Sequence, residues 1–173
     1  MYSRVLLCVS MFLLGFASAG AALAQGHTAR AALKDVQAAA TKWQKDAVLT
    51  NVTTQTVDAD GAAKEWSYLF YSPKTKQAYA VSVQSGKIAD QHPVGPHLTD
   101  PVGEFVDSDA AMKSAKGNGL KANMPTPMAL MMMGQRTAKP GTYWTIGTGY
   151  TPGEVSVLID AKSGKFFRKQ EMK

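Results

Sequence analysis

The chain has 173 residues, with 19 basic residues, 13 acidic residues and a formal charge of +6 at pH 7. Its lysines are scattered rather than clustered, so the charge favours solubility and a mild attraction to an anionic envelope surface over nucleic-acid binding. The single cysteine, Cys8, excludes an internal disulfide.

The N-terminal residues predict a secretory signal. Arg4 precedes an almost wholly apolar or small run from Val5 to Ala22, and Ala22-Leu23-Ala24 places small residues where a signal peptidase cleaves. A membrane anchor is the alternative, but glycines and a serine interrupt the run and no basic stop-transfer cluster follows it. We therefore expect a signal peptide over residues 1–24 and a soluble exported protein, periplasmic or secreted, with no stable membrane insertion after cleavage near Ala24.

Cleavage would change the inventory of reactive groups. Removing 24 of the 173 residues leaves 149, the size of one domain or two very small ones. Loss of Cys8 removes any thiolate nucleophile or cysteine-ligated metal. Loss of Arg4 leaves 18 basic and 13 acidic residues, a charge of +5.

In chain order, the first predicted element is a helix over residues 29–45, capped by Thr28. Its apolar residues recur at helical spacing at Leu33, Val36, Ala40, Trp43 and Ala47. Three strands are predicted to follow it, over residues 48–57, 66–71 and 79–85, the second with its aromatic residues on one side. The next stretch, residues 92–106, is rich in proline and glycine and is predicted to be a linker.

The second half repeats this order. Asp107 or Ser108 is predicted to cap a shorter helix over residues 110–116, which Gly117-Asn118-Gly119 ends. Strands are predicted over residues 128–133, 142–150 and 155–159, and a closing strand begins over residues 165–168.

Several residues recur at a fixed offset, which predicts a duplication. An offset of 78 places Trp66 on Trp144 and Gly86 on Gly164. Upstream, Ala31-Ala32-Leu33-Lys34 matches Ala110-Ala111-Met112-Lys113 at an offset of 79.

The recurring Gly-Lys pair has two interpretations, a phosphate-binding loop or a hairpin turn. A Walker loop needs a glycine five residues before its Gly-Lys pair, and those positions hold Ile159 and Val81. We therefore predict tight turns, in which Gly86 and Gly164 adopt a positive φ.

The segment Val157-Leu158-Ile159-Asp160-Ala161-Lys162-Ser163-Gly164-Lys165-Phe166, preceded by Tyr143-Trp144-Thr145, resembles the PepSY domain family. The likeness covers roughly 60 residues of the second half; the first half matches less well, because Val83-Gln84-Ser85-Gly86-Lys87-Ile88 lacks the Asp-Ala pair. The resemblance implies small exported or envelope-attached α+β modules, some of which lie in the propeptides of secreted metallopeptidases and have an inferred inhibitory or regulatory contact with a peptidase. Since no room for a peptidase domain follows the signal, such a target would be a separate protein.

The expected fold is α+β, with two tandem repeats that each pack a helix on a three- to four-stranded antiparallel sheet. The expected organisation is a signal peptide over residues 1–24, a first PepSY-like repeat over 25–91, a linker over 92–106 and a second repeat over 107–173.

Two groups of residues are candidates for soft-metal binding. His92 and His97 flank a short Pro- and Gly-containing segment, and imidazole suits Zn or Cu, but the prolines prevent the helical spacing that makes such a pair strong. The second group is the methionine-rich segment, with Met128 and Met131, since thioethers are soft ligands for Cu(I). Exposed histidines and a methionine-filled core are the preferred interpretations, so no cofactor is expected.

The methionines also indicate a contact surface. In a strand, Met128, Leu130 and Met132 face one side, while Ala129, Met131 and Met133 face the other. If the first set fills the core, the second forms an apolar patch suited to a partner or a second copy. We predict Met131, Met133 and Tyr150 as partner-binding residues.

No catalytic constellation is present. The histidines lie near the new N-terminus or in the predicted linker, and no cysteine remains, so a triad lacks its base. Asp58 and Asp60 provide too few oxygens for a calcium loop. The prediction is a non-enzymatic exported binding protein that contacts an envelope protein or peptide, such as a peptidase, through a sheet face or edge. A periplasmic copper-binding protein is the alternative.

Overall fold

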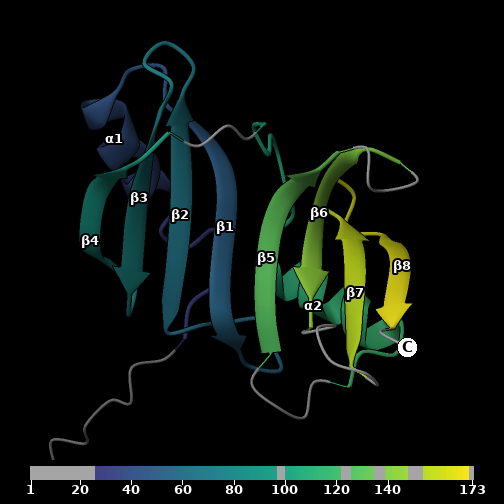
Figure 1. The fold of residues 1–173 in the computed structure, drawn as a ribbon. Coiled ribbons are helices and arrows are strands. Elements are labelled where there is room, and N and C mark those ends of the chain that lie inside the picture. The colour runs from purple at the N-terminus through teal and green to yellow at the C-terminus, as the bar shows by residue number, and fades with distance from the viewer. Residues whose placement is uncertain (1–25, 97–99, 122–125, 135–138, 148–153, 172–173) are drawn as a thin grey trace, which may run out of the picture.

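The computed structural model describes residues 26–96, 100–121, 126–134, 139–147 and 154–171. These ranges contain the helices α1 (Leu33–Trp43) and α2 (Ser108–Gly117) and the strands β1 (Val48–Val57), β2 (Glu65–Ser72), β3 (Gln77–Gln84), β4 (Lys87–Val94), β5 (Thr126–Met133), β6 (Gly141–Ile146), β7 (Val155–Asp160) and β8 (Phe166–Glu171). The eight strands form one antiparallel sheet in the order β4-β3-β2-β1-β5-β6-β7-β8. Figure 1 shows β1 beside β5 at the centre of this sheet.

The predicted fold class is wrong. We expected two helix-on-sheet repeats and left open whether their sheets join. Instead, β1 pairs with β5 from Asn51↔Met131 to Val57↔Thr126 and joins all eight strands into one dominant sheet, with two short helices in the described part of the chain. The strand patterns could not show this, because they fix which residues face the core but not which backbone edge meets which.

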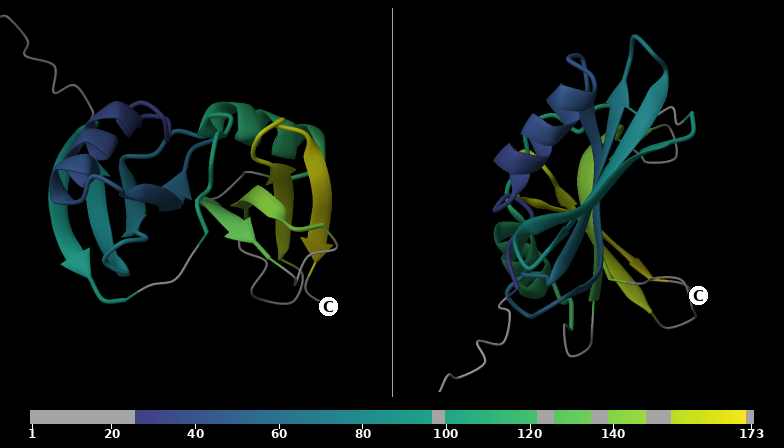
Figure 2. Two further views of the ribbon diagram at one scale, coloured as in Figure 1. Left: turned by 90° about the horizontal axis from the view of Figure 1, so that it is seen from above. Right: turned by 90° about the vertical axis from the view of Figure 1, so that its left-hand side faces the viewer.

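Both helices lie on the same face of the sheet, as the view from above shows (Figure 2). The core lies between them and the sheet, because the strands direct alternate apolar side chains toward the helices. Its largest fully buried side chains are Trp66, Trp144, Tyr68, Tyr143, Phe70, Met112, Met128, Leu130, Ile146, Leu158, Ile159 and Val36. We call the strand residues that point toward α1 and α2 the helix-facing set. Of the buried side chains above, Val36 and Met112 lie on the helices, and all the others except Tyr143 and Leu158 belong to the helix-facing set.

The two tryptophans make the same kind of contact. Trp66 Nε1 donates to the carbonyl of His27 at 2.8 Å, and Trp144 Nε1 donates to the carbonyl of Val106 at 2.9 Å. The indoles also meet edge to face, with ring centroids 6.2 Å apart. Each indole thus bonds to the backbone of the segment that precedes a helix. The duplication of an ancestral unit stays a prediction from the sequence.

A buried serine ties the two halves together on the helix side. The amide of Ala29 donates to Ser108 Oγ at 3.0 Å, and that hydroxyl donates to the carbonyl of Gly61 at 2.7 Å. The amide of Arg30 donates to Asp107 Oδ1 at 2.9 Å. These bonds also explain why α1 begins at Leu33, since the amides of Ala29 and Arg30 are satisfied across the molecule instead of by the predicted Thr28 cap.

The N-cap of α2 follows the prediction. Asp107 has extended backbone angles and its side chain accepts from the amide of Ser108. The predicted linker over residues 92–106 overlaps the end of a strand at its first residues. Strand β4 extends to Val94 and includes His92 and Pro93, because an outer strand tolerates a proline that a central strand would not.

The Gly-Lys pairs lie in hairpin turns, as predicted. Gly86 and Gly164 have φ values of 78° and 68°. In the second turn, Asp160 Oδ1 accepts from the amide of Ser163 at 2.8 Å and from its hydroxyl at 2.6 Å. These bonds hold the pKa of Asp160 below its ordinary value, although partial burial opposes them. The carboxylate therefore stabilises a turn.

Candidate binding site

One face of the sheet has no helix over it. We define this helix-free face by the strand residues that point away from α1 and α2. One of its rows crosses seven strands through backbone pairs, and its members are His92, Ala80, Leu69, Asn51, Met131, Tyr143 and Asp160. In the next row, the residues on the five central strands are small, namely Ser82, Ser67, Thr53, Ala129 and Thr145, and the row ends at Asp90 on β4 and at Leu158 and Arg168 on β7 and β8. The middle of the face is therefore shallow and mostly uncharged.

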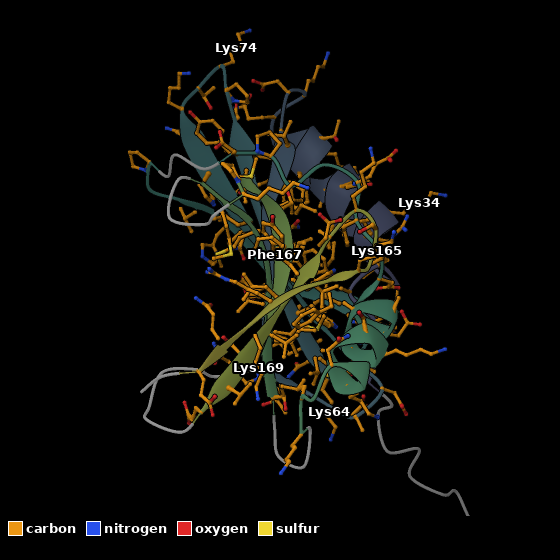
Figure 3. The ribbon with its side chains drawn as sticks, turned by 90° about the vertical axis from the view of Figure 1, so that its right-hand side faces the viewer. Lys34, Lys64, Lys74, Lys165, Phe167 and Lys169 are labelled. Atoms are coloured by element: carbon orange, nitrogen blue, oxygen red, sulfur yellow. The ribbon has the colours of Figure 1, made fainter. Side chains whose placement is uncertain are left out.

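A cluster of larger side chains rises from this face over β5, β6 and β8. We call Met131, Tyr143, Phe167 and Arg168 the Phe167 cluster. Its centre is the contact between the Tyr143 and Phe167 rings, whose centroids are 4.6 Å apart. The guanidinium carbon of Arg168 lies 5.9 Å from the Phe167 ring. Phe167 is one of the residues labelled in Figure 3.

A strand irregularity produces this cluster. Leu158 pairs with Arg168 but Ile159 pairs with Phe166, so Phe167 is an extra residue in β8. Such a bulge lets two consecutive residues oppose a single residue of the partner strand. As a result, Tyr143 and Leu158 are fully buried although they belong to the helix-free face. Phe167, Arg168 and Met131 remain partly exposed.

Tyr143 is held firmly within the cluster. Its hydroxyl donates to the carbonyl of Lys139 at 2.9 Å, and its ring lies over Gly141, where an added Cβ would come within 3.4 Å. Burial raises the pKa of this phenol, and the charge of Asp160 raises it further, while Arg168 acts in the opposite direction. The hydroxyl is therefore a neutral donor that orients the ring.

A hollow of about 750 Å³ opens beside the helix-free face, between the ends of β1 and β2. It begins at Thr53 and Ser67, the last paired residues of the two strands. Its wall contains mainly hydroxyl, amide and small side chains, with Asp58, Lys64 and Glu65 as the charged residues. We call it the β1–β2 hollow.

A second hollow, of about 970 Å³, lies on the helix side between α1 and the segment that leads to α2. Leu33, Leu49 and Phe105 form part of its apolar floor, and Arg30 and Lys162 lie at its margin. In Figure 3, Lys34 and Lys165 also lie on the helix side of the sheet.

The structure places the predicted partner-binding residues as follows. Met131 and Met133 belong to the helix-free face, as the alternation predicts, and both are partly buried. Of the set predicted to fill the core, Met128 and Leu130 are 1% and 0% exposed, whereas Met132, near the end of β5, is 37% exposed. Tyr150 lies outside the described residues.

The alternative metal ligands that the structure describes, His92, Met128 and Met131, do not come together. Met128 is in the core, and His92 lies on β4 with its Nδ1 2.8 Å from Asp90 Oδ2. Four strand spacings separate His92 from Met131, which is about 19 Å. His97 lies outside the described residues. Within the described ranges, no three His, Cys, Asp or Glu side chains are grouped closely enough to hold a metal ion.

Two acidic side chains, Asp58 and Asp46, stabilise turns by accepting hydrogen bonds. Asp58 Oδ1 accepts from the amides of Asp60 and Ala62, both at 2.9 Å. Asp46 accepts from Ser72 Oγ at 2.8 Å and from the amide of Lys74 at 2.8 Å, and the backbone bond is the main cause of its lowered pKa.

Sequence reasoning missed Phe167, Arg168 and the β1–β2 hollow. Phe167 follows directly on a predicted turn, and a strict alternation from Phe166 would place Arg168 on the same face as Phe166. Because of the bulge, Arg168 instead lies on the helix-free face, opposite Leu158. A bulge after a hairpin with a positive-φ residue is a known arrangement, so the Ser-Gly turn is the one signal that could have indicated it.

Comparisons with known proteins show the fold but no family. No family model and no curated protein matches the chain. A similar solved structure is the crystal structure of a "putative lipoprotein" from Clostridium difficile 630, which superposes with a TM-score of 0.55 at 12% sequence identity. The similarity covers 81% of this chain and 92% of the other, so the fold is shared over most of both. The PepSY resemblance stays a prediction from the sequence. Among the described residues, no helix is long and apolar enough to cross a membrane.

Proposed function

We propose that this protein is a non-enzymatic, exported binding protein that contacts an envelope protein through its helix-free face. The Phe167 cluster carries the proposal, because it places partly exposed Met131, Phe167 and Arg168 on a face that neither helix covers. Met, Phe, Tyr and Arg are enriched at the centres of protein interfaces, where charged residues other than Arg are depleted.

Two further observations support the proposal. The five central residues of the neighbouring row are small, so a flat partner surface can approach the middle of the sheet closely. In addition, the protein of similar fold is described as a lipoprotein, which is compatible with a place in the cell envelope and with the signal sequence predicted here. Inhibition of a separate peptidase is the more specific form of the same function.

Site-specific photo-crosslinking in an envelope extract tests the proposal, and adjacent residues provide matched controls. A photoreactive amino acid replaces Met131 or Phe167 on the helix-free face, and Met132 or Phe166 as controls. Met132 and Phe166 are 37% and 40% exposed and pair within the helix-facing set, so they are at least as accessible as the test positions.

We expect a discrete cross-linked partner from positions 131 and 167 and none from 132 and 166. A Met131→Lys variant should weaken capture of that partner about ten-fold or more, while Met132→Lys should not. Equal cross-linking from all four positions would contradict the proposal. An identified peptidase partner should then lose activity on addition of the intact protein.

A further inference from the structure

The pairing of β1 with β2 is interrupted near one end. The strands pair from Val48↔Tyr71 to Thr53↔Ser67, and the hairpin closes where the amide of Asp58 donates to the carbonyl of Ala62 at 2.8 Å. Between these points, residues 54–57 of β1 have no partner on β2, and this interruption opens the β1–β2 hollow. Four residues of strand correspond to a length of about 13 Å.

Backbone groups of β2 face into this gap. The carbonyl of Lys64 accepts from the amide of Ser85, so it points toward β3. Successive backbone groups along a strand point to opposite sides, and therefore those of Glu65 point toward β1. Glu65 lies opposite Gln84 of β3, but its own main-chain groups point away from β3. No residue of β1 lies opposite Glu65.

A segment of the chain itself, at His27, already forms main-chain hydrogen bonds at the start of this edge of β2. The amide of His27 donates to the carbonyl of Ala63 at 2.9 Å, and the amide of Ala63 donates to the carbonyl of His27 at 3.0 Å. This pair is antiparallel and lies two residues before Glu65. An extended segment can therefore form main-chain bonds with β2 at this edge, and the position at Glu65 continues the same line.

The wall of the hollow indicates which segment it would accept. Thr53, Gln55, Thr56 and Ser67 provide hydroxyl and amide groups, and Gln55 and Thr56 are exposed. The charged groups in the wall are two carboxylates, Asp58 and Glu65, and one ammonium group, Lys64. The hollow therefore favours polar, uncharged or basic side chains over acidic ones.

We propose that the β1–β2 hollow binds a short extended peptide segment of the partner, which adds to the sheet by main-chain hydrogen bonds at Glu65. The segment has polar or basic side chains and lacks proline where it pairs. This inference rests on the proposed function, because the hollow joins the helix-free face at Thr53 and Ser67 and a partner on that face can reach into it.

Nuclear magnetic resonance with a synthetic peptide tests the inference. The probe is acetyl-Thr-Lys-Thr-Lys-Thr-amide, added to the isotope-labelled mature protein. We expect shifts of the Gln55, Glu65 and Ser67 amides and slower hydrogen exchange at Glu65. In an extended peptide paired with β2, every second amide points toward β2 and the others point away from it. N-methylation of one set should therefore weaken binding about ten-fold or more, and N-methylation of the other set should have little effect.

Three results would overturn the inference. The first is an absence of shifts at the hollow, or shifts confined to the outer strands β4 and β8. The second is equal sensitivity to both N-methylation patterns. The third is that Glu65 is already protected in the free protein and loses this protection in a chain that begins at Gly26, since the protein's own N-terminal residues would then be the occupant.

The outcome can be separated from that of the proposed function. If cross-linking from Met131 persists but the peptide does not bind at Glu65, the helix-free face is an interface and the hollow is not a peptide site. If the peptide binds as expected but cross-linking is equal at positions 131 and 132, the hollow is a peptide site and the face is not the interface. A Glu65→Gln variant, which removes one carboxylate from the wall and leaves the backbone unchanged, should weaken binding of the lysine-containing peptide while leaving Met131 cross-linking unchanged.

Discussion

At the scale of single residues, His27 has a more constrained environment than His92, the other histidine that the structure describes. Its backbone pairs with Ala63, and its carbonyl also accepts from Trp66 Nε1. Both ring nitrogens are buried, and no partner for them is found within the described residues. Burial therefore lowers the pKa of His27 below its ordinary value of 6.5, because the charged form loses solvation.

This lowered pKa predicts how stability depends on pH. Between the folded pKa and 6.5, the unfolded chain binds more protons than the folded protein. The free energy of unfolding should therefore fall as the pH drops through 6.5 toward the folded pKa, and the loss should end below that value. Urea denaturation at several pH values from about 7.5 to 5 would measure it.

A His27→Gln variant should lose this part of the pH dependence. The control is His92→Gln on the outer strand β4, which leaves the buried ring of His27 in place and should retain the loss of stability below pH 6.5 that His27 causes. A pH dependence that survives His27→Gln unaltered would show that the imidazole of His27 is solvated in the folded protein.

At the scale of elements, the hairpin of β7 and β8 positions the Phe167 cluster. Its turn combines Gly164 at a φ of 68° with the hydrogen bonds from Ser163 to Asp160. The bulge that follows places Phe167 over Tyr143. The geometry of this short turn therefore determines whether the helix-free face presents its largest side chains.

The glycine requirement can be tested with a matched pair of substitutions. Gly164→Ala should destabilise the protein by about 1–2 kcal/mol, since a side chain is strained at positive φ. Gly117→Ala, at the end of α2 with no atom within 4 Å of an added Cβ, should be neutral or stabilise by up to about 1 kcal/mol. Chemical denaturation measures both values, and equal effects would show that the turn does not need its glycine.

At the scale of the whole molecule, the β1–β5 pairing and the buried groups around it make one folding unit of the two halves. Val52 and Leu130 are paired across this seam and are both 0% exposed. Trp66 meets Trp144 across it, and Ser108 links Ala29 to Gly61. Separation of the halves would therefore expose an unpaired strand edge and part of the core.

We accordingly predict that the halves do not fold separately. A fragment of residues 26–96 should lack a cooperative thermal transition by circular dichroism, while the intact mature chain should unfold in a single transition. Mixing it with a fragment of residues 100–173 should restore part of the sheet signal. Two resolved transitions in the intact protein, or cooperative unfolding of the isolated fragment, would contradict this prediction.

Much of the local structure was predictable because local rules decide it. Helical spacing, strand alternation and turn residues located both helices and seven of the eight strands, although α1 is shorter than predicted and β4 was missed. Asp107 was recognised as a cap and Gly164 as a turn residue, since each acts on backbone groups a few positions away. The methionine pattern also separated Met128 from Met131 correctly.

By itself, the sequence determined the order of the elements other than β4, the core faces of most strands and the turn residues, because these follow from the period of side-chain directions along the chain. Only the tertiary structure decided that β1 meets β5 in one sheet, that the bulge at Phe167 brings Arg168 to the helix-free face beside it and that β1 and β2 separate to form a hollow. The physical reason is that backbone edges carry the same donors and acceptors whatever their side chains are. Which edges pair, and where a pairing breaks, is therefore set by the packing of segments distant in the chain.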